Sequence, residues 1–183
     1  MVVEELDIPG CYQIIPNVFN DERGAFIKTY HYETFIKYGI ALDIKEEFYS
    51  ISKKNVLRGL HFQAPPTAHN KLVYCPKGAV LDFFVDIRVG SPTYGQSVSV
   101  ELNEKNCKML FLPVGIAHGF VSLLDNSLMV YKIDCSYDPK TDSGIRFDSC
   151  NVQLPIRNEC LIVSSRDSSL VEWKDFESGF MYE

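Results

Sequence analysis

Short apolar runs, broken repeatedly by turn residues, dominate the middle of the chain. Segments 71–90 and 97–134 are rich in Val, Ile, Phe and Tyr, in runs that are either wholly apolar or alternate with polar residues. Pro-Lys-Gly, Gly-Ser-Pro, Asn-Glu-Lys-Asn and Asp-Asn-Ser clusters interrupt them. A two-residue period with such breaks is typical of β-strands joined by hairpins.

Helical periodicity is weak and confined to two short stretches, residues 31–39 and 168–176. The chain contains no repeat, low-complexity tract or linker. We therefore expect one all-β domain over residues 1–183, a β-sandwich or jelly-roll barrel with a few short helices. Such a barrel closes its sheet edges and leaves an interior or mouth for a ligand.

Composition and charge narrow the functional classes. The net charge of −6 argues against general binding to nucleic acid or anionic membranes, so any phosphate site must be local. The N-terminus is acidic where a signal peptide would be basic, and no apolar run approaches the length of a membrane span. The six scattered cysteines form no C-x-x-C pair and are expected to be reduced thiols. These features predict a cytoplasmic protein without a membrane partner.

Residues 56–73, VLRGLHFQAPPTAHNKLV, concentrate cationic and proton-transferring side chains in a chain with only four histidines. In a regular strand, Arg58 and His61 would point to opposite faces. Only a bulge or bend near Gly59 could aim both into one cavity. The structural alternative is a hydrogen-bonded core histidine beside a surface ion pair.

A second motif, Pro-x-Gly-x-x-His at residues 113–118, resembles the second motif of the cupin superfamily, whose histidines often bind metal. A metal site needs three or four converging ligands, and the other candidates are His31, His61 and His69. The first cupin motif, His-x-His with a following Glu, is absent, because His61 is followed by Phe and Gln. A metal-free cupin is therefore favoured.

Further stretches, in order, extend the resemblance: NDERGAF, VLRGLHFQAPPTAHNKLV, DFFVDIRVGSPTYGQ, LPVGIAHGF, YKIDCSY and SSRD. Together they resemble the nucleotide-sugar 4-keto epimerases typified by dTDP-4-dehydrorhamnose 3,5-epimerase, over about Gly10 to Asp167. This resemblance implies a cupin-type jelly roll, a homodimer that exchanges N-terminal strands, and epimerisation beside a ketone with no cofactor or metal. The implied substrate is a nucleotide-diphosphate-linked 4-keto sugar.

Inversion of a carbon beside a ketone needs a base, stabilisation of the enolate oxygen, and an acid on the opposite face. The resemblance implies His61 as the base, with Asp167 as its partner. A carboxylate on one ring nitrogen fixes the imidazole tautomer and stabilises the imidazolium.

The resemblance assigns the remaining catalytic roles to three further positions. It implies Lys71, supported by His118, as the group that stabilises the oxyanion, and Tyr131 as the proton donor. Tyr137 is a second tyrosine of the site. Taken singly, Tyr131 and Lys71 also fit core and strand-flanking positions, and Asp167 fits a turn in a Ser-rich loop.

Arginines are expected to bind the diphosphate, because their planar guanidinium groups suit phosphate oxygens. The resemblance points to Arg23, Arg58 and Arg166, where the last replaces a usual lysine, and assigns Phe26 to the substrate site. In such dimers one of these residues can come from the neighbouring subunit.

Three residues depart from the rhamnose-pathway pattern in the base-binding region. Lys28 stands where Glu is expected, Glu46 replaces Gln, and Phe48 replaces Asn. A carboxylate accepts the N1–H and N2–H pair of guanine bidentately, so a GDP-linked hexose or heptose is favoured, with a dTDP sugar second. Inversion at C3, at C5 or at both remains open.

Two functions from other classes stay open at this point. One is a metal-dependent cupin oxygenase or isomerase that uses His61, His69 and His118. The other is a non-catalytic sugar-binding cupin, which would not need His61 paired with Asp167.

Overall fold

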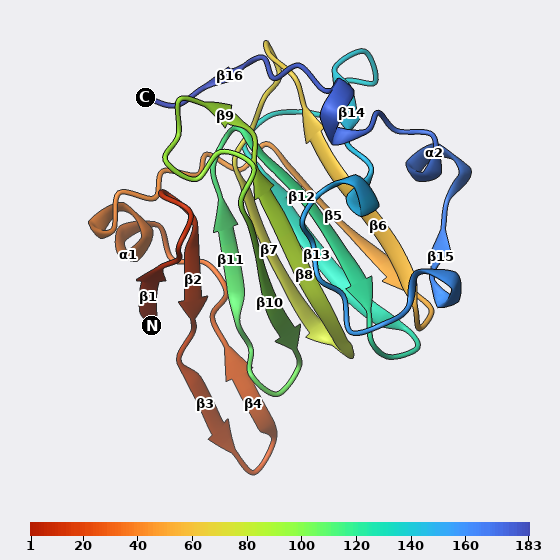
Figure 1. Ribbon diagram of the computed structural model, residues 1–183. Coiled ribbons are helices and arrows are strands. Elements are labelled where there is room, and N and C mark those ends of the chain that lie inside the picture. The colour runs from red at the N-terminus through yellow and green to blue at the C-terminus, as the bar shows by residue number, and fades with distance from the viewer.

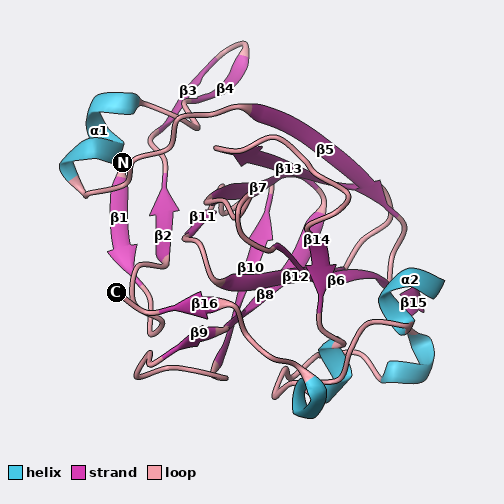
Figure 2. Ribbon diagram, turned by 90° about the horizontal axis from the view of Figure 1, so that it is seen from above, coloured by secondary structure: helices cyan, strands magenta, loops and turns pink.

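Two β-sheets face each other in the computed structural model, which describes residues 1–183 (Figures 1 and 2). The first sheet consists, in spatial order, of β1 (Val2–Glu5), β2 (Tyr12–Ile15), β11 (Met109–Leu112), β7 (Lys71–Lys77), β13 (Ser127–Ile133) and β5 (Glu46–Ser52). The second consists of β10 (Ser97–Asn103), β8 (Ala79–Asp86), β12 (Ile116–Ser122), β6 (Val56–Gln63) and β14 (Asp142–Gly144), and β15 (Ile162–Val163) also pairs with β6. The prediction of an all-β fold is confirmed.

The helices are few and short. The stretch predicted at residues 31–39 contains α1 (Tyr32–Lys37), which confirms that prediction. The helix predicted over residues 168–176 is wrong, because α2 (Ser165–Ser168) ends as that stretch begins and only a 3-10 turn, Trp173–Asp175, follows. Between them Val171 forms a β-bridge with Ile145, which requires an extended backbone there. No helix is both long and apolar enough to span a membrane.

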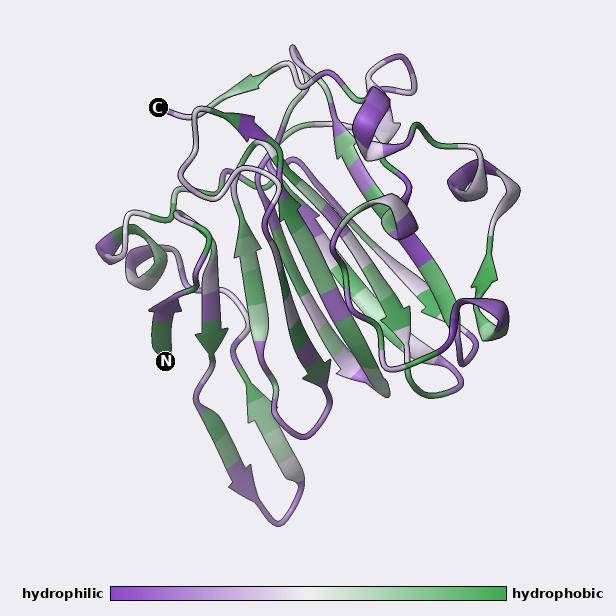
Figure 3. Ribbon diagram, viewed as in Figure 1, coloured by the Kyte–Doolittle hydropathy of each residue, from purple (hydrophilic) through white to green (hydrophobic).

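Three hydrophobic clusters follow from the alternation of side chains along the strands. The cluster between the sheets includes Val73, Phe84 and Phe120. The outer face of the first sheet packs with residues of and after α1, and the outer face of the second packs under the C-terminal segments. Figure 3 shows the strands of both sheets as mainly hydrophobic, with hydrophilic positions interspersed. Polar side chains that face the space between the sheets are therefore the exceptions that form the site.

One hairpin projects away from both sheets, at the lower end of Figure 1. Its strands β3 (Val18–Asp21) and β4 (Gly24–Ile27) pair only with each other. Phe19 and Phe26 are 59% and 61% exposed on it. A second small pair, β9 (Arg88–Val89) and β16 (Phe180–Met181), joins the C-terminal end to the region after β8.

A β-bulge interrupts the pairing of β6 with β12. His61 lies opposite His118 and Arg58 lies opposite Phe120, so β6 advances three residues where β12 advances two. Gly59 occupies the bulge with φ +126°, and a Cβ there would lie 2.5 Å from the Gly119 Cα. Glycine is the one residue that fits this backbone and this close approach. The bulge, which was the condition for aiming both side chains into one cavity, is present at Gly59, and Arg58 and His61 line the same cavity.

Candidate active site

A cavity of about 770 Å³ opens between the two sheets and is lined by residues of both sheets and of α2. Nine of the twelve residues predicted for the site line it: Glu46, Arg58, His61, Lys71, His118, Tyr131, Tyr137, Arg166 and Asp167. They come from segments far apart in the sequence. The fold therefore gathers into one cavity residues that the sequence separates by up to about 120 positions.

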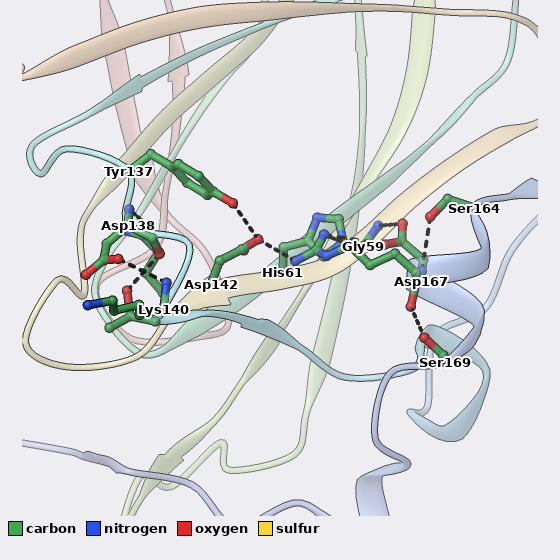
Figure 4. A network of polar contacts seen from close by, with 12 residues as sticks. Gly59, His61, Tyr137, Asp138, Lys140, Asp142, Ser164, Asp167 and Ser169 are labelled. Carbon is green, nitrogen blue, oxygen red and sulfur yellow. Dashed lines mark hydrogen bonds and ion pairs between the residues drawn. The ribbon is translucent and has the colours of Figure 1, made fainter.

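His61 and Asp167 form a carboxylate–imidazole pair at the wall of this cavity. The His61 Nε2 lies 2.7 Å from Asp167 Oδ1, and the Gly59 amide donates to Asp167 Oδ2 at 3.2 Å (Figure 4). Ser164 caps α2 by accepting from the Asp167 amide, which fixes the carboxylate's backbone. His61 keeps 28% of its side chain exposed. No protein group hydrogen-bonds to its Nδ1, so that nitrogen is free for a ligand.

Arg166 competes with Asp167 for the same ring nitrogen. Its Nη1 lies 3.0 Å from the His61 Nε2, while its Nη2 donates to Asp142 Oδ2 at 2.7 Å. A neutral imidazole nitrogen either donates to the carboxylate or accepts from the guanidinium, and cannot do both. The carboxylate contact is shorter and charge-assisted in the imidazolium form. This favours the tautomer with the proton on Nε2 and the lone pair on Nδ1.

The pKa of Asp167 is lowered. Burial alone would raise it, but the hydrogen bond and charge of His61, the Gly59 amide and the Arg166 charge together outweigh burial. The carboxylate is therefore ionised at neutral pH and holds the imidazole in place.

Lys71 lies deeper in the cavity, on β7. Its Nζ donates to the His61 carbonyl oxygen at 3.0 Å. Burial lowers the pKa of Lys71 to about 8, against the opposing charges of Asp142 and Asp82. A group with this pKa is mostly cationic at pH 7 and can stabilise a developing negative charge.

His118 forms a second imidazole–carboxylate pair that sequence reasoning missed. Its Nε2 lies 2.7 Å from Asp82 Oδ2, both side chains are almost fully buried, and Asp82 Oδ1 has no hydrogen-bond partner. Burial raises the pKa of Asp82, although His118 and Lys71 oppose it. One signal was present in the sequence: an aspartate inside the apolar run AVLDFFV, at a position that alternation directs between the sheets.

Tyr131 projects from β13 in the first sheet, across the cavity from β6. Its ring stacks on Phe48, the residue opposite it on β5, with centroids 4.9 Å apart and an interplanar angle of 13°. The His118 ring meets the Tyr131 ring in an edge-to-face arrangement, with ring centroids 6.0 Å apart. Burial and the Asp82 charge raise the pKa of Tyr131, so its hydroxyl is protonated at neutral pH.

Polar contacts already engage several residues expected to bind substrate. Glu46 Oε2 accepts from the Tyr137 amide at 2.9 Å, and Arg58 Nε donates to Ser52 Oγ at 3.2 Å. The Tyr137 hydroxyl donates to Asp142 at 3.2 Å. Asp142, which carried no distinguishing signal in the sequence, thus links Tyr137 to Arg166.

Three predicted residues do not join the cavity in this chain. Arg23 and Phe26 lie on the projecting β3–β4 hairpin and Lys28 directly after it. Arg23 pairs with Asp21 on the hairpin itself. Within one copy of the chain the hairpin extends away from the sheets that form the cavity, so the assignment of these three residues to the site stays a prediction.

The three histidines of the metal hypothesis all line the cavity, but they do not form a metal-ligating group. No set of three or more His, Cys, Asp or Glu side chains lies close enough together to hold a metal ion. The Nε2 atoms of His61 and His118 each face a carboxylate. His69 lies against Gln63, and burial together with the charge of Lys71 lowers its pKa to about 4.

Comparisons with known proteins agree over nearly the whole chain. A family model described as dTDP-4-dehydrorhamnose 3,5-epimerase matches residues 5–175. The dTDP-4-dehydrorhamnose 3,5-epimerase of Salmonella typhimurium is 44% identical over 146 residues, 79% of this chain and 80% of that protein. The dTDP-4-dehydrorhamnose 3-epimerase of Streptomyces niveus is 37% identical over 146 residues, 79% of this chain and 70% of that protein.

The structural comparison gives the same result. The crystal structure of dTDP-6-deoxy-D-glucose-3,5-epimerase from Legionella pneumophila, in complex with dTDP-4-keto-L-rhamnose, is similar to this chain with a TM-score of 0.94. The sequences are 30% identical, and the match covers 100% of this chain and 98% of that one. The predicted cupin-type jelly roll is thereby confirmed.

Proposed function

The chain belongs to the dTDP-4-dehydrorhamnose 3,5-epimerase family, whose members are isomerases of sugar nucleotides, and from this premise we propose that it inverts carbons beside the ketone of a dTDP-linked 4-keto-6-deoxy sugar. One observation carries the proposal. His61 comes from the second sheet and Tyr131 from the first, and both line one cavity. A sugar carbon held between them has a base on one face and an acid on the other, as inversion requires.

His61 is the proposed base. Its Nδ1 takes the proton from the carbon beside the ketone, and the electrons of the broken C–H bond move onto the ketone oxygen. Asp167 holds the ring and stabilises the imidazolium that results. The free Nδ1 and the 2.7 Å contact at Nε2 support this role.

The enolate oxygen needs positive charge or hydrogen-bond donors close to it. Lys71 supplies a mostly protonated ammonium group, and the buried His118 lies at the same cavity wall. Tyr131 then gives its proton to the opposite face of the carbon and becomes a phenolate. Solvent afterwards restores the proton on Tyr131 and removes the one on His61, so the reaction is a net inversion with no redox change.

The nucleotide is proposed to be dTDP, in place of the GDP predicted from Glu46. The relatives compared above are all named for dTDP-linked sugars. One Glu46 oxygen already accepts from the Tyr137 amide, which weakens the argument for bidentate recognition of guanine. Calorimetric titration should show dTDP binding at least about 10-fold more tightly than GDP, or about 1.4 kcal/mol. Equal affinities would contradict a preference for dTDP, and a GDP preference that is lost in Glu46→Gln would return GDP to first place.

A homodimer is part of the proposal. The exposed Phe19 and Phe26 on a projecting hairpin, and the unpaired outer edge of β5, are features that a second copy would cover. Arg23 would then reach the diphosphate in the partner's cavity, beside that copy's Arg58 and Arg166. Light scattering should give twice the chain mass, and mixing His61→Asn with Arg23→Ala subunits should restore activity that neither variant has alone. A monomer, or no restoration after subunit exchange, would contradict this arrangement.

The central experiment is incubation with dTDP-4-dehydro-6-deoxyglucose in deuterated water. NMR should locate deuterium at C3, at C5 or at both, with inverted product, in protein treated with chelator. The same experiment decides between one and two inverted carbons. Activity that appears only after a metal ion is restored would support a metal-dependent cupin. Binding with no deuterium uptake would support a sugar-binding module.

A further inference from the structure

In the whole chain only two buried side-chain oxygen or nitrogen atoms make no hydrogen bond: Ser50 Oγ and Asp82 Oδ1. A buried polar group without a partner lowers the stability of the fold, so such groups are rare. Ser50 also lines the cavity, and Asp82 is hydrogen-bonded to His118, which lines it too. Both atoms are therefore next to the catalytic cavity and none is elsewhere in the molecule.

Strand register places Ser50 beside the proposed proton donor. Phe48 and Ser50 lie two residues apart on β5, on the face that lines the cavity. Phe48 is the direct neighbour of Tyr131 on β13, and Ser50 is the direct neighbour of Met129. The ring of Phe48 stacks on the ring of Tyr131 and limits its rotation. The hydroxyl of Ser50 belongs to the next residue of β5 that faces the cavity.

Tyr131 needs help to give up its proton. Burial and the Asp82 charge both oppose the phenolate form and raise the pKa of Tyr131. Two neighbours act in the opposite direction and lower the pKa of Tyr131, the Ser50 hydroxyl and the charge of Arg58. Arg58 already donates to Ser52, whereas the Ser50 hydroxyl has no other partner.

We propose that Ser50 is a positioning residue for the proton donor, and that its hydroxyl donates a hydrogen bond to the Tyr131 oxygen as this becomes a phenolate. The proton that reaches carbon comes from Tyr131, and Ser50 keeps its own. The inference rests on the proposed function, since it gives Tyr131 the role of acid. It explains why a buried hydroxyl is retained without a partner in the resting protein.

The test separates proton removal by His61 from proton return by Tyr131. In Ser50→Ala, inversion of dTDP-4-dehydro-6-deoxyglucose should fall about 10- to 100-fold, because a hydrogen bond to a charged group is lost. Deuterium uptake from solvent with retained configuration should continue, since it depends on His61. Ser50→Thr, which keeps the hydroxyl, should recover most of the inversion rate. Ser99→Ala, at an exposed position on β10, is the matched control and should behave as the wild type.

Stability provides the second measurement. Ser50→Ala removes an unpartnered buried hydroxyl, so its unfolding temperature should equal or exceed that of the wild type. Should it fail to fold, Ser50→Cys keeps the size but donates weakly, and its inversion rate should lie below that of Ser50→Thr. Wild-type inversion in Ser50→Ala or Ser50→Cys, or an equal loss of inversion and deuterium uptake, would overturn the inference. Failure of the proposed function itself would look different, because the wild type would then take up no deuterium.

Discussion

The two histidine–carboxylate pairs of the cavity have the same contact distance, but the pKa values of their carboxylates shift in opposite directions. His61–Asp167 and His118–Asp82 are each 2.7 Å apart through Nε2. Asp167 receives an additional backbone N–H and lies near a guanidinium, and its pKa is lowered. Asp82 is fully enclosed with one oxygen unsatisfied, and its pKa is raised.

This difference teaches that the contact between the partners does not set the charge state of a pair. The surroundings of the carboxylate set its charge state, because burial penalises the ionised form and each donated hydrogen bond stabilises it. Asp167 is therefore suited to hold an imidazole that must become cationic. Asp82 is suited to keep His118 fixed in a dry environment, where polar interactions with the substrate are stronger.

The largest effect is expected from breaking the first pair at its histidine. In His61→Asn the side chain keeps a similar size but lacks a basic nitrogen, so proton exchange beside the ketone should fall by about 10²- to 10⁴-fold. Affinity for dTDP, measured by calorimetry, should stay close to that of the wild type. Exchange at the wild-type rate would remove His61 from the mechanism.

A smaller effect is expected at the carboxylates, and it should differ between the pairs. Asp167→Asn loses a charge-assisted hydrogen bond to the imidazolium and can stabilise the wrong tautomer, so exchange should fall about 10- to 150-fold. Asp82→Asn keeps a hydrogen-bonding group beside His118, so its loss should stay under about 10-fold. Steady-state rates of both variants, with KM reported separately, check the order. Equal losses would show that the pairs have equivalent roles.

The smallest expected effects are on the stability of the fold, and their dependence on pH should have opposite signs for Asp167 and Asp82. The pKa of Asp167 is lowered, so its ionised form stabilises the fold above the unfolded pKa of about 3.9, and this stabilisation is lost as the pH falls through the lower folded pKa. The pKa of Asp82 is raised, so the fold favours its protonated form, and that stabilisation is lost as the pH rises through the higher folded pKa.

Thermal unfolding from pH 7 down to pH 3 tests these signs. Relative to the wild type, Asp167→Asn should unfold at a lower temperature at pH 7, and the difference should shrink on acidification. Asp82→Asn should unfold at an equal or higher temperature at pH 7 and lose any advantage on acidification. Each 1 kcal/mol corresponds to about 2–4 °C for a chain of this size. Parallel behaviour of the two variants would contradict the opposite pKa shifts.

Much of the fold and of the site could be predicted because the information is local. Alternation and turn residues indicate the strands, and ordered motifs point to residues such as His61 and Lys71. Asp82 and Asp142 were missed because their roles depend on which strand and loop lie next to them. The place of Arg23 stays a prediction, since motif order does not reveal which way a hairpin projects and the cavity of one chain does not include it. The argument for guanine at Glu46 is weakened by the contact of this residue with the Tyr137 amide, which depends on the tertiary structure and gives no signal in the sequence.

The extra residue in β6 adds a backbone group without changing which side chains face the cavity. Leu57, Leu60 and Phe62 pack in the outer cluster, although Leu57 and Phe62 also reach the cavity wall, and Arg58 and His61 line the cavity. If Gly59 were absent, simple alternation would already send all five to these same sides. A one-codon insertion at this point therefore leaves the side-chain pattern of the strand unchanged and adds one backbone N–H, the one that Asp167 accepts. A strand without this residue would present the same arginine and histidine to the cavity but would lack the amide that helps to keep the carboxylate ionised.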